Sequence, residues 1–328
     1  MIKEFKKGDV IFREGDAGDN VYQIEEGTVS VYAGYGEGDQ TLLTELGKGR
    51  FFGEMATIED YPRSATVVAN ENLKVLEIRR AEIKDYFKSN PEKIIDIMKG
   101  MTGRLRALTD DYAEASHVIA ELSDNMDKEF GGALVELIMN LVTKYKRNKA
   151  ITRLSAETER VLEKSVHSSG YSAEIETFDK GDIIFREGEK SDCMYDIHFG
   201  SIGIYDGYGT PSEKLLTTLT SNMFFGELGM IDNVERSCTA VAMEDATTLE
   251  IITAADLPEL FEKNPEKLKM IFGHLAFRIR QLTREYVNAC RTVDRVNEAK
   301  KRGEIDDDLK SSVAKSRDDL LVVRSLKL

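Results

Sequence analysis

The sequence reads Phe-Gly-Glu-Met-Ala at residues 52–56 and Arg-Ser-Ala-Thr at residues 63–66. The same pattern returns as Phe-Gly-Glu-Leu-Gly at residues 225–229 and Arg-Ser-Cys-Thr at residues 236–239. The shift between the copies (52 to 225) holds without a gap back to Phe5 and its equivalent Phe178. A glycine turn, a carboxylate and an arginine are therefore kept together twice. The chain contains a tandem repeat, and each copy ends in a candidate anion-binding segment.

Composition excludes several classes of protein. The chain has 328 residues, a formal net charge of −14 and 3 cysteines, which lack CxxC spacing and are interpreted as reduced thiols. This length fits two domains with connecting helices. The acidic balance argues against a DNA-coating protein, because non-specific nucleic-acid affinity depends on Lys and Arg that neutralise phosphates. No specific DNA binding is expected either, because the acidic chain lacks a recognition module. No apolar run reaches the roughly 18 residues of a membrane span, and the N-terminus does not resemble a signal peptide. We expect a cytoplasmic protein.

The residues that precede each signature have the character of short β-strands. Residues 5–15 and 178–188 are apolar runs broken by Gly-Asp and Glu-Gly pairs. Residues 21–32 and 194–205 alternate apolar and polar side chains around a glycine, which predicts a half-buried hairpin. Further strands are predicted at residues 42–46, 65–69 and 73–78. Many short strands at spacings of about ten residues indicate an antiparallel sandwich or barrel.

Each repeat then becomes helical. Asn-Pro-Glu-Lys at residues 90–93 and again at residues 264–267 places a proline at a helix start. Apolar residues then follow at alternating spacings of three and four, which is typical of a coiled-coil seam. The two matching series are Leu105, Leu108, Tyr112, Ile119, Leu122 and Ile279, Leu282, Tyr286, Val293, Val296.

Two arrangements of these seams are open. We favour pairing of the two seams within one chain, because intramolecular pairing gains from a high effective concentration. The alternative is a homodimer in which each seam meets its own copy. The first half of each long helix is interpreted as lying back on the sheet domain of its own repeat.

These signals divide the chain into four segments. Residues 1–126 form a first domain with its long helix, and residues 127–172 form a helical connector. Residues 173–300 form a second domain with its long helix, and residues 301–328 form a helical or partly disordered tail.

The repeated signature has the chemistry of a phosphate site. A Phe-Gly-Glu after a strand suits a short turn whose N–H groups, near Gly53 and Ala56, point at an anion. Arg63 offers a fork of donors to two phosphate oxygens, and Ser64 adds a hydroxyl. Glu54 can accept a hydrogen bond from a ribose 2′-OH. We therefore predict a small phosphorylated ligand in each repeat, the second set being Gly226, Glu227, Gly229, Arg236 and Ser237.

These residues resemble the phosphate-binding cassette of the cyclic nucleotide-binding domain family, which includes catabolite activator protein, protein kinase A regulatory subunits and cyclic-nucleotide-gated channels. The family pattern ends in Pro-Arg-(Ala/Ser/Thr)-Ala, and residues 62–65 match it. The second copy departs from the pattern at Glu235, where proline is usual, and at Cys238, where alanine is usual. Glu235 lies next to Arg236 in sequence and is expected to compete for the guanidinium. Residues 127–172 and the tail lie outside the resemblance.

The resemblance implies an α+β fold with two antiparallel β jelly-roll barrels, each followed by a long helix, and a helical connector between them. It also implies a 3′,5′-cyclic nucleotide as the ligand. Arginine would hold the cyclic phosphate, glutamate the ribose, and the turn amides the remaining phosphate oxygens. Many cGMP-selective relatives have threonine where this chain has Ser64 and Ser237, so cAMP is favoured over cGMP.

The function expected from this pattern is a non-catalytic sensor that transmits nucleotide binding through its long helices to a protein partner. The alternatives are a transcription regulator of the catabolite activator type and a regulatory subunit of a kinase. No nucleophile, metal set, cofactor motif or general-base pair indicates an enzyme. Arg104 and Arg278 begin the second half of each long helix and are interpreted as solvent-facing rather than as nucleobase contacts.

Overall fold

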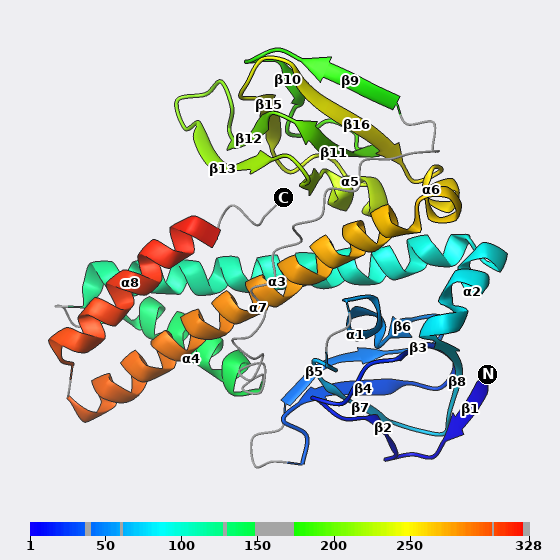
Figure 1. The fold of residues 1–328 in the computed structure, drawn as a ribbon. Coiled ribbons are helices and arrows are strands. Elements are labelled where there is room, and N and C mark those ends of the chain that lie inside the picture. Colours follow the sequence, from blue (N-terminus) through cyan, green and yellow to red (C-terminus); the bar gives the residue numbers. More distant parts are fainter. Residues whose placement is uncertain (37–40, 60–61, 127–129, 148–173, 304, 324–328) are drawn as a thin grey trace. The chain divides into compact units, whose positions relative to one another are not determined.

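The computed structural model describes residues 1–36, 41–59, 62–126, 130–147, 174–303 and 305–323 (Figure 1). The chain divides into two compact units. The first consists of Met1–Glu77, Arg104–Glu157 and Arg278–Val323. The second consists of Ile78–Gly103, Thr158–Phe277 and Arg324–Leu328. Part of the predicted connector, residues 148–172, lies outside the described residues.

The first repeat forms two four-stranded sheets. One has the order β1 (Ile2–Phe5), β8 (Leu73–Arg79), β3 (Asn20–Glu26), β6 (Phe51–Phe52). The other has the order β2 (Val10–Phe12), β7 (Thr66–Ala69), β4 (Val29–Ala33), β5 (Thr41–Leu46). Apolar side chains from both sheets share one core, which includes Tyr22, Phe52, Val67 and Val75. The two sheets therefore pack face to face.

The second repeat has the same topology. One sheet has the order β9 (Glu174–Phe178), β16 (Thr247–Thr253), β11 (Cys193–Phe199), β14 (Phe224–Phe225). The other has the order β10 (Ile183–Phe185), β15 (Thr239–Ala242), β12 (Ser201–Asp206), β13 (Lys214–Thr220). The prediction of antiparallel strands is confirmed. The described strands form pairs of separate sheets rather than closed barrels, because hydrogen bonding stops at the edge strands of each sheet.

The predicted hairpin at residues 21–32 is wrong. β3 pairs with β6 and β8, whereas β4 pairs with β5 and β7, so the chain crosses from one sheet to the other at Gly27. Gly27 has a φ of +87°, and a Cβ there would lie 2.7 Å from the Asn72 carbonyl oxygen. Gly200 makes the same crossing in the second repeat with a φ of +86°. Alternation of polar and apolar residues indicates a half-buried strand but not its partner.

The helices begin where the sequence predicts. In the first repeat a 3₁₀ turn (Arg80–Glu82) leads into α2 (Ile83–Ser89), followed by α3 (Glu92–Asn125), which starts directly after Pro91, and α4 (Gly132–Arg147). The second repeat has α6 (Leu257–Lys263), α7 (Pro265–Arg302) and then α8 (Asp307–Val323). Among the described helices, none combines the length and the apolar character that crossing a membrane requires.

Each unit combines helices from both repeats. In the second unit, the rings of Phe87 on α2 and its repeat equivalent Phe261 on α6 meet edge-on, with centroids 5.7 Å apart. A contact between equivalent residues is the mark of two-fold symmetry. The same unit contains the start of α3, where the Thr102 hydroxyl donates to Asp232 Oδ1 at 3.1 Å. Residues Glu92–Gly103 of α3 therefore group with the second repeat, which corrects the expectation from sequence for this part of the helix.

The first unit contains the remainder of both long helices together with α4 and α8. Lys144 of α4 lies 2.6 Å from Asp111 of α3, and Arg317 of α8 lies 2.8 Å from Asp124 of α3. Thr292 of α7 and Ser316 of α8 share a hydrogen bond of 3.0 Å. All the seam residues except Leu108, which is half-buried, are buried here. Both seams therefore lie in the same compact unit of the chain. Pairing of the two seams with each other within one chain stays a prediction.

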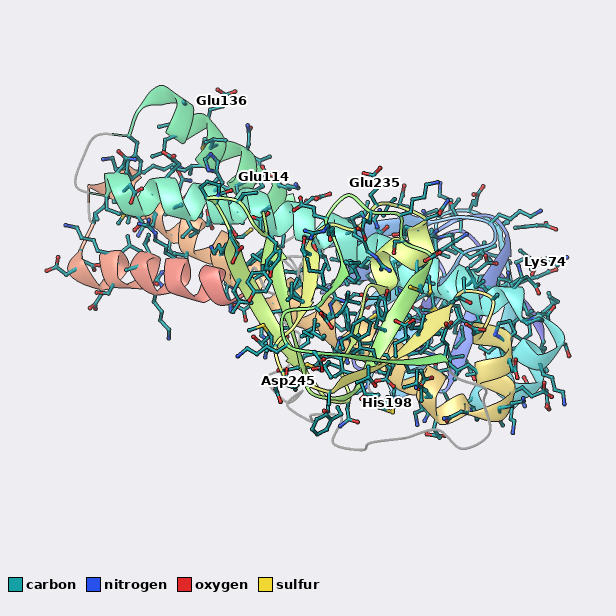
Figure 2. All side chains as sticks on the ribbon, turned by 90° about the horizontal axis from the view of Figure 1, so that it is seen from above. Lys74, Glu114, Glu136, His198, Glu235 and Asp245 are labelled. Atoms are coloured by element: carbon teal, nitrogen blue, oxygen red, sulfur yellow. The ribbon has the colours of Figure 1, made fainter. Side chains whose placement is uncertain are left out.

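A buried cluster of charges attaches the start of α7 to the second sandwich. The Lys267 ammonium, fully buried, lies 2.7 Å from Asp196 of β11 and also pairs with Glu250 of β16. His198 Nε2 lies 2.7 Å from Glu250 Oε2 and 3.5 Å from Asp196 Oδ2; Figure 2 labels this histidine. When His198 is protonated, two positive charges balance two negative ones. The equivalent of His198 in the first repeat is Glu25, so the first repeat lacks this histidine.

The pKa values in this cluster follow from its geometry. The hydrogen bond to Asp196 raises the pKa of His198, and burial opposes that rise only partly. Burial also works against the charged form of Asp196, but His198 and Lys267 together lower the pKa of that carboxyl. The surroundings therefore favour the charged forms of His198 and Asp196.

The second unit should lose stability as the pH rises above the unfolded histidine pKa of about 6.5 and through the raised folded value. A histidine whose pKa is raised by folding stabilises the fold fully below its unfolded value of about 6.5 and loses that contribution as the pH passes the folded value. Asp196 affects stability only in acid, because its contribution to the free energy of unfolding is lost as the pH falls below about 4. Thermal unfolding between pH 5.5 and 9 measures this, with His198→Gln as the variant that cannot titrate. Equal pH slopes for the wild type and the variant would contradict the assignment.

Candidate functional site

The repeated signature forms the same turn in both sandwiches. In the first repeat, β6 ends at Phe52, Gly53 follows with a φ of +80°, and α1 (Glu54–Glu59) begins at once. In the second, Gly226 has a φ of +79° between β14 and α5 (Glu227–Asp232). Non-glycine residues rarely adopt this conformation. We call the segment from this glycine to the arginine that precedes the next strand, Arg63 or Arg236, the cassette.

The arginine of the first cassette lies inside the protein. Arg63 is only 4% exposed. Its Nη1 donates to the Gly53 carbonyl oxygen and its Nη2 to the Asn20 carbonyl oxygen, both at 2.7 Å. The guanidinium carbon lies 4.2 Å from the ring centre of Phe12, within cation–π range. Burial lowers the pKa of Arg63, and Tyr22 and Glu54 oppose this effect.

The arginine of the second cassette is held in nearly the same way. Arg236 is 5% exposed, and its Nη1 donates to the Gly226 carbonyl oxygen at 2.9 Å. Its guanidinium carbon lies 4.2 Å from the ring centre of Phe185, the equivalent of Phe12. Its Nη2 approaches Cys193 Sγ at 3.4 Å instead of a carbonyl oxygen. Glu235 is exposed and accepts no hydrogen bond from Arg236, so it does not compete for the guanidinium here.

Both guanidinium groups have a hydrogen-bond donor that is not used. The Nε atoms of Arg63 and Arg236 are buried and have no hydrogen-bond partner among the described residues. Neither arginine forms an ion pair with a carboxylate within the part of the chain that the structure describes. A buried cation without a counter-ion is energetically unfavourable unless something else supplies the negative charge.

The glutamates are buried beside these turns. Glu54 and Glu227 are each 1% exposed. Glu54 forms an ion pair with Arg104 of α3, whose Nη1 also lies 3.6 Å from Met55 Sδ. The interpretation of Arg104 as solvent-facing is therefore wrong, because its guanidinium contacts two consecutive residues of the first cassette. Arg278 is also buried rather than solvent-facing.

The structure brings together most but not all of the predicted site residues. Gly53, Glu54, Ala56 and Arg63 lie in one turn, with their equivalents in the other, and all of these except the half-buried Gly53 and Gly226 are buried. The hydroxyl-bearing side chains are exposed instead, namely Ser64 and Ser237.

Sequence reasoning missed several residues that contact the arginines. Phe12 and Phe185 occupy equivalent positions in the repeat, and that match was the available signal. Asn20 is the third residue that was missed, because its contribution is a backbone carbonyl, which carries no side-chain signature.

Comparison with known proteins identifies the family that each repeat matches. A family model described as cyclic nucleotide-binding domain matches residues 2–90 and 175–264. A cAMP-dependent protein kinase regulatory subunit from Debaryomyces hansenii is 28% identical over 243 residues, covering 74% of this chain and 41% of the relative. One from Dictyostelium discoideum is 22% identical over 251 residues, covering 75% of this chain and 61% of the relative. The chain thus spans less than two thirds of the length of these relatives.

Solved structures also match. A cAMP-bound form of an EAL enzyme is 37% identical over 26% of this chain and 23% of that chain, with a TM-score of 0.25.

The glycine of each cassette should be irreplaceable for two separable reasons. A Cβ on Gly53 would lie 2.6 Å from Arg63 Nη1, and one on Gly226 would lie 2.5 Å from Arg236 Nη1. Gly15 and Gly188 share the positive φ, but a Cβ on either would meet no atom within 4 Å. Gly15→Ala and Gly188→Ala should therefore cost only the backbone strain, about 1–2 kcal/mol. Gly53→Ala and Gly226→Ala should cost more, because they also displace the guanidinium. Urea unfolding measures the difference, and equal losses in each pair would refute the contact.

Proposed function

The chain belongs to the cyclic nucleotide-binding domain family, and on that premise we propose that each repeat binds one 3′,5′-cyclic nucleotide, cAMP in preference to cGMP. Each two-sheet sandwich is then the β jelly roll of that family. The names of the curated relatives support cAMP, since several are cAMP-dependent protein kinase regulatory subunits. The serines at positions 64 and 237 agree with that preference.

One observation carries the proposal. Two equivalent arginines are buried with an unpartnered Nε and without a carboxylate partner among the described residues. A cyclic phosphate is a monoanion with two exocyclic oxygens, and a guanidinium meets two such oxygens with parallel donors. Binding would supply the missing negative charge and a partner for Nε. The turn glycine leaves the guanidinium the space that it needs.

The first glutamate offers a route from the ligand to a helix. Glu54 is the proposed ribose-binding carboxylate, and its present partner is Arg104 of α3. A ribose 2′-OH that donates to Glu54 would share this carboxylate with Arg104. Nucleotide binding would then weaken or rearrange the ion pair that connects the cassette to α3. The protein would act as a non-catalytic cytoplasmic sensor that passes this change to a protein partner.

The curated relatives favour one class of partner. Several of them are regulatory subunits of protein kinases and others are cGMP-dependent protein kinases, so a kinase catalytic subunit is the candidate partner that these names support. A kinase assay with and without the chain and cAMP tests this candidate separately from nucleotide binding.

Loss of either arginine should remove one site. Arg63→Ala and Arg236→Ala each leave a phosphate without its charge partner, which costs about 2–5 kcal/mol of binding free energy. Isothermal titration with cAMP should show two sites per chain in the wild type and one in each variant. Absence of heat with both cAMP and cGMP in the wild type would refute the proposal.

Loss of Arg104 should separate binding from transmission. Arg104→Gln leaves the phosphate contacts in place but removes the ion pair between Glu54 and α3. Hydrogen exchange should show a nucleotide-dependent change in α3 of the wild type that is absent in the variant. Titration should show that the variant still binds nucleotide at both sites. An unchanged helix response in Arg104→Gln would exclude this route, and Arg106→Gln provides a control on the same helix.

A further inference from the structure

The two cassettes differ at a pair of positions that change together. The second cassette has Ser191 and Gly229, and the equivalent positions of the first have Gly18 and Ala56. A Cβ on Gly229 would collide with the Ser191 hydroxyl and its Cβ. Alanine at position 229 is therefore incompatible with serine at position 191 in this geometry. The exchange keeps the total side-chain volume similar, as compensated core substitutions do.

The Ser191 hydroxyl lacks a partner in its present surroundings. Ser191 is 5% exposed, and its Oγ has no hydrogen-bond partner among the described residues. A buried hydroxyl without a partner costs about 1–3 kcal/mol. Ser191 lies against the backbone of Gly229, in the turn proposed to receive the phosphate. Two residues further along the chain, at the start of β11, Cys193 contacts the arginine of the same cassette. The unpartnered Ser191 hydroxyl is therefore placed to donate a hydrogen bond to an anion bound in this turn.

The arginine of the second cassette is also less firmly held. Arg63 Nη2 donates to a carbonyl oxygen at 2.7 Å, whereas Arg236 Nη2 has a thiol sulfur at 3.4 Å. Sulfur is the weaker acceptor. Turning Nη2 toward a ligand therefore costs Arg236 a weaker hydrogen bond than it costs Arg63.

From these contacts we propose that Ser191 is a phosphate-binding residue of the second cassette alone, and that the second site therefore binds a cyclic nucleotide more tightly than the first. This inference rests on the proposed function. The Ser191 hydroxyl donates to an exocyclic phosphate oxygen, and Gly229 provides the space that its side chain occupies. The first cassette has no hydroxyl at that position, because Gly18 has no side chain.

The test measures each site by itself with cAMP as the probe. In an Arg63→Ala background only the second site binds, and in an Arg236→Ala background only the first does. Adding Ser191→Ala to the first background should weaken cAMP binding about tenfold or more, since a hydrogen bond to a charged group contributes about 1.5–3 kcal/mol. The same change should not lower the melting temperature of the unliganded protein, because it removes a hydroxyl that has no partner.

The reciprocal variant provides an independent test. Gly18→Ser together with Ala56→Gly transfers the pair to the first cassette and should tighten cAMP binding there by a similar factor. Ala56→Gly alone is the matched control and should not tighten it. If Ser191→Ala does not fold, this reciprocal variant still tests whether the serine binds phosphate.

Three results would overturn the inference. They are an unchanged dissociation constant on Ser191→Ala, a loss of unliganded stability that accompanies the loss of affinity, and no gain from the transferred pair. In each case, one site lost with Arg63→Ala and the other with Arg236→Ala would leave the proposed function intact. Absence of any cAMP or cGMP binding by the wild type would instead refute the proposed function itself.

Discussion

A buried guanidinium, fixed to the carbonyl oxygen of a glycine in the left-handed conformation, is the interaction on which each cassette depends. The contact requires glycine twice over, because a side chain would strain the backbone and would also occupy the place of Nη1. The ring of Phe12 or Phe185 adds a cation–π contact to the guanidinium. The arrangement also leaves a positive charge inside the protein without a carboxylate partner among the described residues. The proposed function starts from this missing negative charge, which we propose an anionic ligand supplies.

The two cassettes share the contact between arginine and glycine but have different contacts with the helices around them. In the first, the carboxylate of Glu54 connects the turn to Arg104 of α3. In the second, Asp232 at the end of α5 accepts a hydrogen bond from Thr102, which also belongs to α3. One long helix therefore contacts a residue of each cassette. Lys267 attaches the other long helix, α7, to the second sandwich through two buried carboxylates. Two similar sites are thus connected to the long helices through different contacts.

The sequence predicts the parts of this structure that are local or repeated. Glycine, glutamate and arginine were identifiable because their spacing occurs twice, and the helix starts were identifiable because Pro91 and Pro265 mark them. The pairing of β3 and β4 was not predictable, since alternation gives the buried face of a strand but not its neighbour. The role of Arg104 was not predictable either, because its partner Glu54 lies far away in sequence and only the packing of α3 brings them together. Ser191 would have been visible only by comparing the repeats as pairs of positions, where Gly18 and Ala56 are exchanged for Ser191 and Gly229.

The central claim is that one chain contains two sites, each completed by a cyclic nucleotide. Native mass spectrometry of the wild-type protein with increasing cAMP tests it most directly, because the method counts ligands on each chain. The account predicts mass additions of one and then two nucleotides on a single chain. A spectrum in which the chain stays unliganded with both cAMP and cGMP would contradict it.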